Sequence, residues 1–101
     1  MRYKIKYQTR GKVESYIAMS TSYIASLNGL YEEYQLESIL QGIADHVEEM
    51  ANTETRGLTA KPQYEIEHND LSVRNTAGRE VLTVWFERVY ENGYGGQVKR
   101  L

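Results

Sequence analysis

Hydrophobic and polar residues alternate along the first segment of the chain. Tyr3 and Ile5 fall on one side of an extended backbone while basic residues fall on the other, which is the pattern of a half-buried strand over residues 2–9. Gly11 follows within a polar turn, and a period of two then resumes over residues 13–19. The two segments together predict an N-terminal β-hairpin.

The next stretch, residues 20–28, has two interpretations. Its apolar residues either prolong the second strand or form a short helix that ends at the Asn-Gly pair of residues 28–29. Asn-Gly fits both, because it occurs in tight hairpin turns and at helix C-termini. We prefer a break near residues 20–22, followed by irregular or short helical structure.

The clearest periodic signal lies between residues 31 and 51. Apolar residues recur there at helical spacing, namely Leu36, Ile39, Leu40, Ile43, Val47 and Met50. Such a continuous apolar stripe predicts one long amphipathic helix. Each buried side chain of this size contributes about 1.5–3 kcal/mol, so the helix is expected to pack on another element.

The second half of the chain returns to strand patterns. Three further strands are predicted at residues 63–68, 71–74 and 79–91, separated by turns at 69–70 and 76–78. In the last strand, Val81, Trp85 and Val89 are four apart and also fit a helix, but its β-branched and aromatic content favours a strand. A glycine-rich segment then ends the regular structure.

The predicted order of elements is therefore ββαβββ. Since each amphipathic strand offers one apolar face, the expected fold class is α+β in two layers. An antiparallel sheet of about five strands would pack on one long amphipathic helix. One domain is expected over residues 1–92, with a flexible C-terminal tail at 93–101.

Composition narrows the class of protein. The chain has 101 residues and no cysteine, which excludes disulfides, thiolate metal sites and a cysteine nucleophile. No apolar run approaches the roughly 20 residues of a membrane span, and no apolar leader follows Met1. These features predict a cytoplasmic protein with no membrane partner.

Charge is segregated along the chain although its sum is only -2. The first twelve residues carry five basic residues and no acid, whereas residues 31–54 carry seven acids and no lysine or arginine. Such asymmetry can steer a charged partner, although two oppositely charged segments of one domain can also face each other.

Catalytic and metal-binding patterns are missing. Glu65 and Glu67 would share one strand face and His68 the other, so the three would not converge on one ion. His46 and Glu49 are three apart on the helix, without the second histidine of a zinc-protease motif. No Gly-x-Ser-x-Gly sequence or phosphate-binding glycine pattern occurs. We expect no enzyme activity, no cofactor and no metal.

The leading functional prediction is protein binding. Tyrosines that do not fit the apolar stripes are expected at the surface, where rings favour recognition. The predicted protein interface comprises Tyr16, Tyr31, Tyr34, Glu33, Glu37 and Tyr94. Small size, split charge and the missing catalytic set suggest a regulatory or inhibitor protein of the phage or mobile-element accessory type, with an unidentified protein partner.

Two alternatives stay open. A nucleic-acid-binding module would use the basic hairpin, whose candidate residues are Arg2, Lys4, Lys6, Arg10 and Lys12. Lysines on a terminal strand also serve to protect a sheet edge from pairing. The second alternative is a homodimer or larger homo-oligomer in which sheet edges pair between copies.

Overall fold

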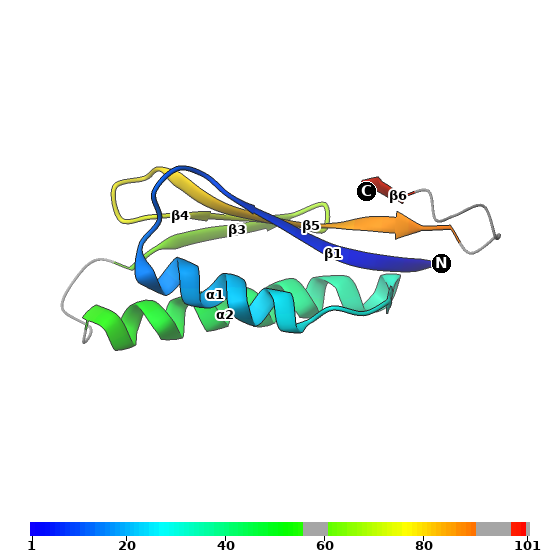
Figure 1. Cartoon of the computed structure of the whole chain (residues 1–101), viewed down its shortest axis with the longest axis horizontal. Helices are drawn as coiled ribbons and strands as arrows, with labels where there is room; N and C mark the ends of the chain where they lie inside the picture. The colour runs from blue at the N-terminus through cyan, green and yellow to red at the C-terminus, as the bar shows by residue number, and fades with distance from the viewer. Residues whose placement is uncertain (56–60, 91–97, 101) are drawn as a thin grey trace.

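The computed structural model describes residues 1–55, 61–90 and 98–100, with side chains at 1–53 and 61–90. Its elements are β1 (Arg2–Thr9), α1 (Ser15–Ser26), β2 (Tyr31–Glu32), the 3-10 helix η1 (Glu33–Gln35), α2 (Leu36–Thr55), β3 (Gln63–Glu67), β4 (Asp70–Arg74), β5 (Glu80–Val89) and β6 (Val98–Arg100). The strands form one layer and both long helices form the other (Figure 1). The predicted α+β class, the antiparallel sheet and the long helix are confirmed.

Strand β5 lies at the centre of the sheet. The order of strands is β2-β1-β5-β4-β3, and all pairs are antiparallel. Strand β1 pairs with β5 along its whole length, from Arg2 opposite Val89 to Thr9 opposite Leu82. Strands β4 and β6 pair with successive parts of the other side of β5. The main pairing partner of β1, strand β5, is therefore distant from it in sequence.

The predicted N-terminal hairpin is wrong, because residues 15–26 form helix α1 instead of a second strand. One side of this helix is buried, with Ile17, Ser20 and Ile24 at 0% exposure. The Ser20 hydroxyl donates a hydrogen bond to the Tyr16 carbonyl oxygen at 2.7 Å, so this buried hydroxyl is satisfied. Treating Ser20 as a break concealed the helical spacing and removed one of the two helices from the prediction.

Helix α2 confirms the predicted amphipathic helix, with a later start. Leu36, Leu40, Ile43 and Val47 are at most 2% exposed, while Ile39 and Met50 are partly buried against the same core. The N-terminal turn is fixed by η1, where the Gln35 side-chain oxygen accepts a hydrogen bond from the Glu32 backbone N–H. This bond satisfies one donor that the helix start leaves free.

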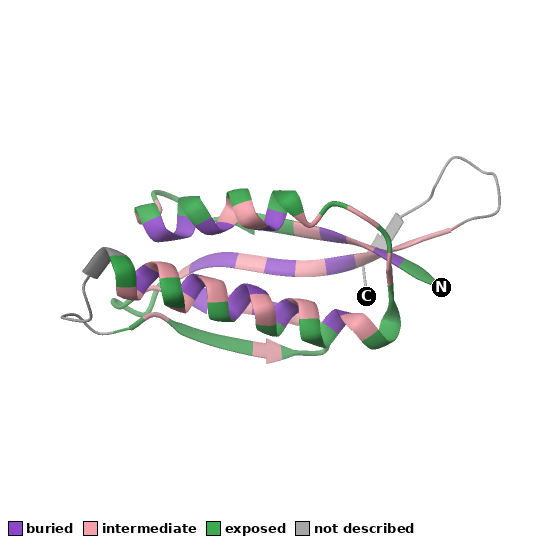
Figure 2. Cartoon of the chain, turned by 90° about the horizontal axis from the view of Figure 1, so that it is seen from below, coloured by how far each residue is buried: buried purple, intermediate pink, exposed green. Residues whose placement is uncertain are grey.

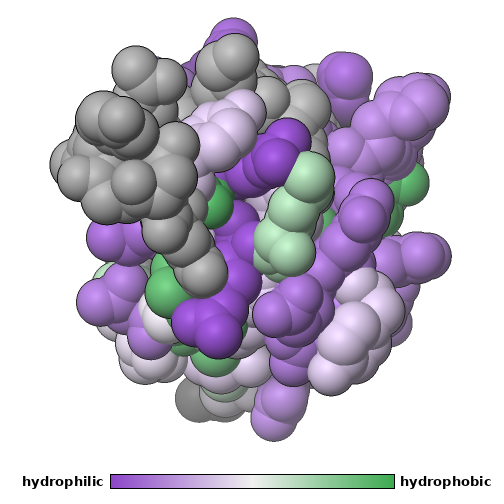
Figure 3. All heavy atoms as spheres, turned by 90° about the vertical axis from the view of Figure 1, so that its right-hand side faces the viewer, coloured by the Kyte–Doolittle hydropathy of each residue, from purple (hydrophilic) through white to green (hydrophobic). Residues whose placement is uncertain are grey.

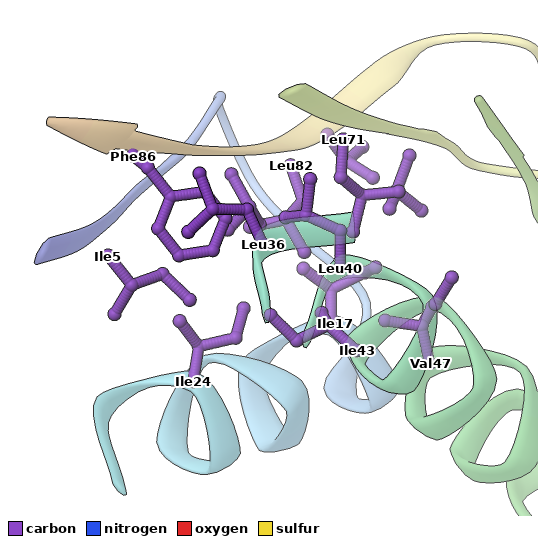
Figure 4. Packing of buried hydrophobic residues seen from close by; sticks show 14 of the residues in the cluster. Ile5, Ile17, Ile24, Leu36, Leu40, Ile43, Val47, Leu71, Leu82 and Phe86 are labelled. Carbon is purple, nitrogen blue, oxygen red and sulfur yellow. The ribbon is translucent and has the colours of Figure 1, made fainter. Parts of the chain in front are cut away.

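The core fills the space between the layers. Figure 4 shows Ile17 and Ile24 of α1 pointing, together with the α2 stripe, toward Phe86, Leu82 and other apolar residues of the sheet. Buried residues line the sheet-facing side of both helices, whereas β3 is almost entirely exposed (Figure 2). Both helices are therefore integral to one core.

The second half of the sheet agrees with the predicted strands. The turn between β3 and β4 contains His68 and Asn69, whose φ angles of 52° and 60° suit a two-residue hairpin loop. The C-terminal segment differs from the expected tail, since residues 98–100 form β6 and pair with β5. Residues 91–97 and 101 lie outside the described residues.

Candidate functional site

The start of α2 is preceded by the most exposed tyrosine in the described part of the chain. Tyr34 lies in η1 and is 83% exposed. A shallow, open groove of about 620 Å³ runs from this ring along the helix, and its lining residues are Tyr34, Glu37, Ser38, Gln41, Gly42 and Asp45. We call this surface the Tyr34 groove. Two of the predicted interface residues, Tyr34 and Glu37, therefore lie on one surface.

The Tyr34 groove is acidic. Glu37 and Asp45 belong to it, Glu33 precedes Tyr34 on η1, and all three are exposed. No ion pair is recorded for any of these carboxylates within residues 1–53 and 61–90. Their charges are therefore available to a ligand.

The middle of the groove is held by hydrogen bonds. The Gln41 side-chain nitrogen donates to an Asp45 carboxylate oxygen at 3.0 Å and to the Tyr64 hydroxyl of β3 at 3.3 Å. A Cβ placed on Gly42 would have no neighbour within 4 Å. The groove thus has ordered polar groups and open space beside the helix backbone.

Two predicted interface tyrosines belong to the interior. Tyr16 is only 5% exposed because it lies on the buried side of α1, so its assignment to an exposed interface is wrong. Tyr31 is half-buried, its hydroxyl donates to the Leu27 carbonyl oxygen, and its ring packs edge-on against Phe86. Tyr94 lies outside the described residues. Among the described residues, Tyr34 is therefore the one predicted interface tyrosine that is exposed.

The predicted basic residues do not form a hairpin. Arg2, Lys4 and Lys6 alternate with buried residues of β1, which places them on the sheet face away from the helices. We call this the open face, because no described element covers it (Figure 1). Arg10 instead pairs with Glu80 at 3.6 Å, and Lys12 lies in the loop before α1.

The sequence analysis missed an aromatic residue beside the basic row. Trp85 of β5 lies opposite Lys6, on the open face, and is partly exposed. Its indole N–H donates to a Glu87 carboxylate oxygen at 3.4 Å, and Glu87 lies opposite Lys4. Trp85 alternates with the buried Val84 and Phe86, and this alternation is the signal that could have placed it outward.

Acidic residues also gather on the open face, at the β3 border of the sheet. A shallow hollow of about 240 Å³ is lined by Glu65, Glu67, His68, Asp70 and Ser72. No group of three potential metal ligands occurs among the described residues.

The end of the molecule near the N-terminus is mostly hydrophilic, with apolar side chains in small separate patches (Figure 3).

Comparisons with known proteins add no functional information. The chain matches no protein-family model, no curated protein and no solved structure. No helix in the described ranges is long and apolar enough to cross a membrane. The function must therefore be argued from the surfaces themselves.

Proposed function

We propose that this chain is a non-catalytic binding protein that recognises a basic segment of another protein through the Tyr34 groove. The observation that carries the proposal is the 83% exposed Tyr34 ring at the head of a groove that also contains Glu37 and Asp45. A tyrosine supplies large contact area at low entropic cost while its hydroxyl stays hydrogen-bonded. A regulatory or inhibitory role in the cytoplasm is part of this proposal.

Charge supports the choice of partner. Glu33, Glu37 and Asp45 carry carboxylates that lack recorded ion pairs, so an arginine- or lysine-bearing segment would meet complementary charge. The open space beside Gly42 would accept a partner side chain. The Gln41 side-chain oxygen, whose amide nitrogen donates to Asp45 and Tyr64, can accept a hydrogen bond that orients the bound segment.

A displayed library of random peptides, panned against the immobilised chain, tests the proposal. Enriched peptides should be rich in arginine and lysine. Tyr34→Ala and Glu37→Lys should each weaken their binding by about tenfold or more, equivalent to about 1.4 kcal/mol. Enrichment of acidic or neutral peptides, or binding that survives both substitutions, would contradict the proposed groove.

Two matched variants serve as controls. Tyr7→Ala removes a partly exposed ring from β1, and Glu49→Lys reverses an exposed charge of α2 outside the groove residues. Glu49→Lys changes the net charge as much as Glu37→Lys does. Both controls should keep peptide affinity within about twofold. Neither residue lines the groove, and an exposed charge outside the contact has little effect on affinity.

Nucleic-acid binding at the open face is a second candidate, favoured by the position of Trp85 beside Lys4 and Lys6. A partly exposed ring beside cations suits a single strand, through base stacking and phosphate contacts. Binding of a labelled oligonucleotide should quench Trp85 fluorescence, weaken steeply with salt, and be lost in Lys6→Glu. Absence of binding at low salt would reject this candidate.

A further inference from the structure

The two borders of the sheet are both open to a further strand. Strand β2 pairs with β1 only at Arg2 and Tyr3, so residues 4–9 have no strand on that side among the described elements. Strand β3 pairs with β4 on one side only. The two open edges lie on opposite borders of the molecule, with α1 beside the β1 border (Figure 2).

The β1 edge is basic on one face and apolar on the other. Lys4 and Lys6 lie on the open face, where no ion pair is recorded for them within the described side chains. Ile5 and Tyr7 lie on the helix face, opposite the buried Phe86 and Val84. Tyr7 is nevertheless 41% exposed at this border.

The β3 edge has the complementary pattern. Tyr64 and Ile66 lie on the helix face, since they pair with the buried Val73 and Leu71. Glu65 and Glu67 therefore lie on the open face, and among the described side chains an ion pair joins Glu67 to the exposed His68 of the next turn at 3.4 Å. Tyr64 is 41% exposed, like its counterpart on β1.

We propose that copies of this chain associate edge to edge, with β3 of one copy pairing with the free edge of β1 in the next. Strands β1, β5, β4 and β3 alternate in direction, so β3 of a copy displaced sideways runs antiparallel to β1. The sheet would then continue across the contact with its helices on one side. Each new pairing satisfies backbone groups that an edge leaves open.

The register follows from side-chain alternation, which permits shifts only in steps of two. With Ile66 opposite Ile5, Glu65 meets Lys6 and Glu67 meets Lys4. Two residues further along, with Ile66 opposite Tyr7, Glu67 meets Lys6. Each register joins opposite charges on the open face and apolar side chains on the helix face, the pairs that stabilise antiparallel strands.

Space beside β1 is open to side chains of an incoming strand. A groove of about 250 Å³ lies between β1 and α1, lined by Ile5, Lys6, Tyr7, Ile24, Ala25 and Asn28. Four strands span about 19 Å and two packed helices span about 16–20 Å. If the next copy is displaced by the width of four strands, its helices therefore lie beside those of the first copy at the usual distance between packed helices.

Charge selects this contact over the symmetric ones. Pairing of two β1 edges would place lysines against lysines, and pairing of two β3 edges would place glutamates against glutamates, which is unfavourable. The lysines of β1 therefore disfavour pairing with most other strands, but they permit pairing with an acidic edge such as that of β3. A contact between two different edges leaves one edge of each type free, so assembly continues until a ring closes or a filament grows.

Light scattering after size exclusion, over micromolar to near-millimolar concentrations of the full chain, tests the proposal. The wild-type mass should rise with concentration beyond that of a dimer. The variants Lys4→Glu/Lys6→Glu and Glu65→Lys/Glu67→Lys should each stay monomeric, because each gives both edges the same charge. A wild type that is monomeric throughout, or that stops at a dimer, would overturn the proposal.

Charge reversal on both edges supplies the decisive control. The chain with all four substitutions, and an equimolar mixture of the two double variants, should both regain the concentration-dependent mass, since opposite edges then match again. Circular dichroism should confirm that each variant is folded, as expected for exposed or half-exposed positions. If the folded double variants still assemble, or if neither reversal restores assembly, the contact lies elsewhere.

Discussion

The two long helices cover the same sheet, but their sequences specify them in different ways. Helix α2 separates an apolar stripe from an acidic outer side. Helix α1 contains no charged residue, and its N-cap residue, Glu14, makes no side-chain capping bond. Its exposed positions include Ala18, Met19 and Ser22. Helix α1 therefore depends on tertiary packing, whereas α2 also has local signals of its own.

The first prediction has the largest expected effect and tests whether the packing of α1 contributes as much to the free energy of unfolding as that of α2. Ile24 of α1 and Leu40 of α2 are both 0% exposed, so Ile24→Ala and Leu40→Ala should each lower the free energy of unfolding by about 2–5 kcal/mol. Urea unfolding followed by circular dichroism measures both. A loss well below 1 kcal/mol for Ile24→Ala alone would mean that α1 is only loosely attached.

The difference between the helices also explains what could be predicted from the sequence. The Leu36 to Met50 stripe has a single period, so helix α2 was recognisable. The β3-β4 hairpin was also recognisable, because turn residues flank its alternating segments. In α1, alternation over residues 13–19 imitated a strand, and the buried Ser20 broke the helical pattern. The true partner of β1 is β5, a long-range pairing that no local pattern indicates.

The candidate site residues also differ in how far the sequence could place them. Tyr34 and Glu37 could be proposed because they stand outside the α2 stripe, and their involvement in binding stays a prediction. Tyr16 was misplaced because its helix was not recognised. Trp85 was missed because it stands within the apolar run of β5, although its alternation with Val84 and Phe86 places it on the outward face, and the pairing with Lys6 of β1 shows the same.

The second prediction concerns the loop that leads into α1. Gly11 has φ +65°, and a Cβ there would lie 2.8 Å from Arg79 Nη1. The Arg79 guanidinium donates to the Arg10 and Lys12 carbonyl oxygens, which ties the loop to the turn before β5. Gly11→Ala should therefore lower the free energy of unfolding by about 1.5–3 kcal/mol, through backbone strain plus displacement of Arg79.

Gly78→Ala is the matched control for this prediction. Gly78 has φ +85°, but a Cβ there would meet nothing within 4 Å, so only backbone strain of about 1–2 kcal/mol applies. In an Arg79→Ala background, the excess cost of Gly11→Ala over Gly78→Ala should disappear. If the excess persists without the guanidinium, the loop is not held by Arg79.

The third prediction addresses the contact between the helices. The Tyr23 ring of α1 stacks on the His46 ring of α2, with centroids 4.2 Å apart and planes at 4°. A double-mutant cycle with Tyr23→Leu and His46→Leu should give a coupling energy of about 0.5–1.5 kcal/mol. Additive losses would mean that the rings contribute burial but no specific stacking energy.

The fourth prediction has the smallest expected effect and concerns an ion pair introduced on the exposed side of α1. Ala18 and Ser22 are exposed and four residues apart, so Ala18→Glu with Ser22→Lys places an ion pair in the favourable orientation. The paired variant should be more stable than the sum of the single variants by about 0.3–0.5 kcal/mol at low salt. This coupling should fade as salt is added, because exposed charges are screened. If the paired variant is also at least as stable as the wild type, the uncharged outer side of α1 is not a requirement of the fold. If the pair instead destabilises α1, the small uncharged residues are themselves part of what keeps this helix in place.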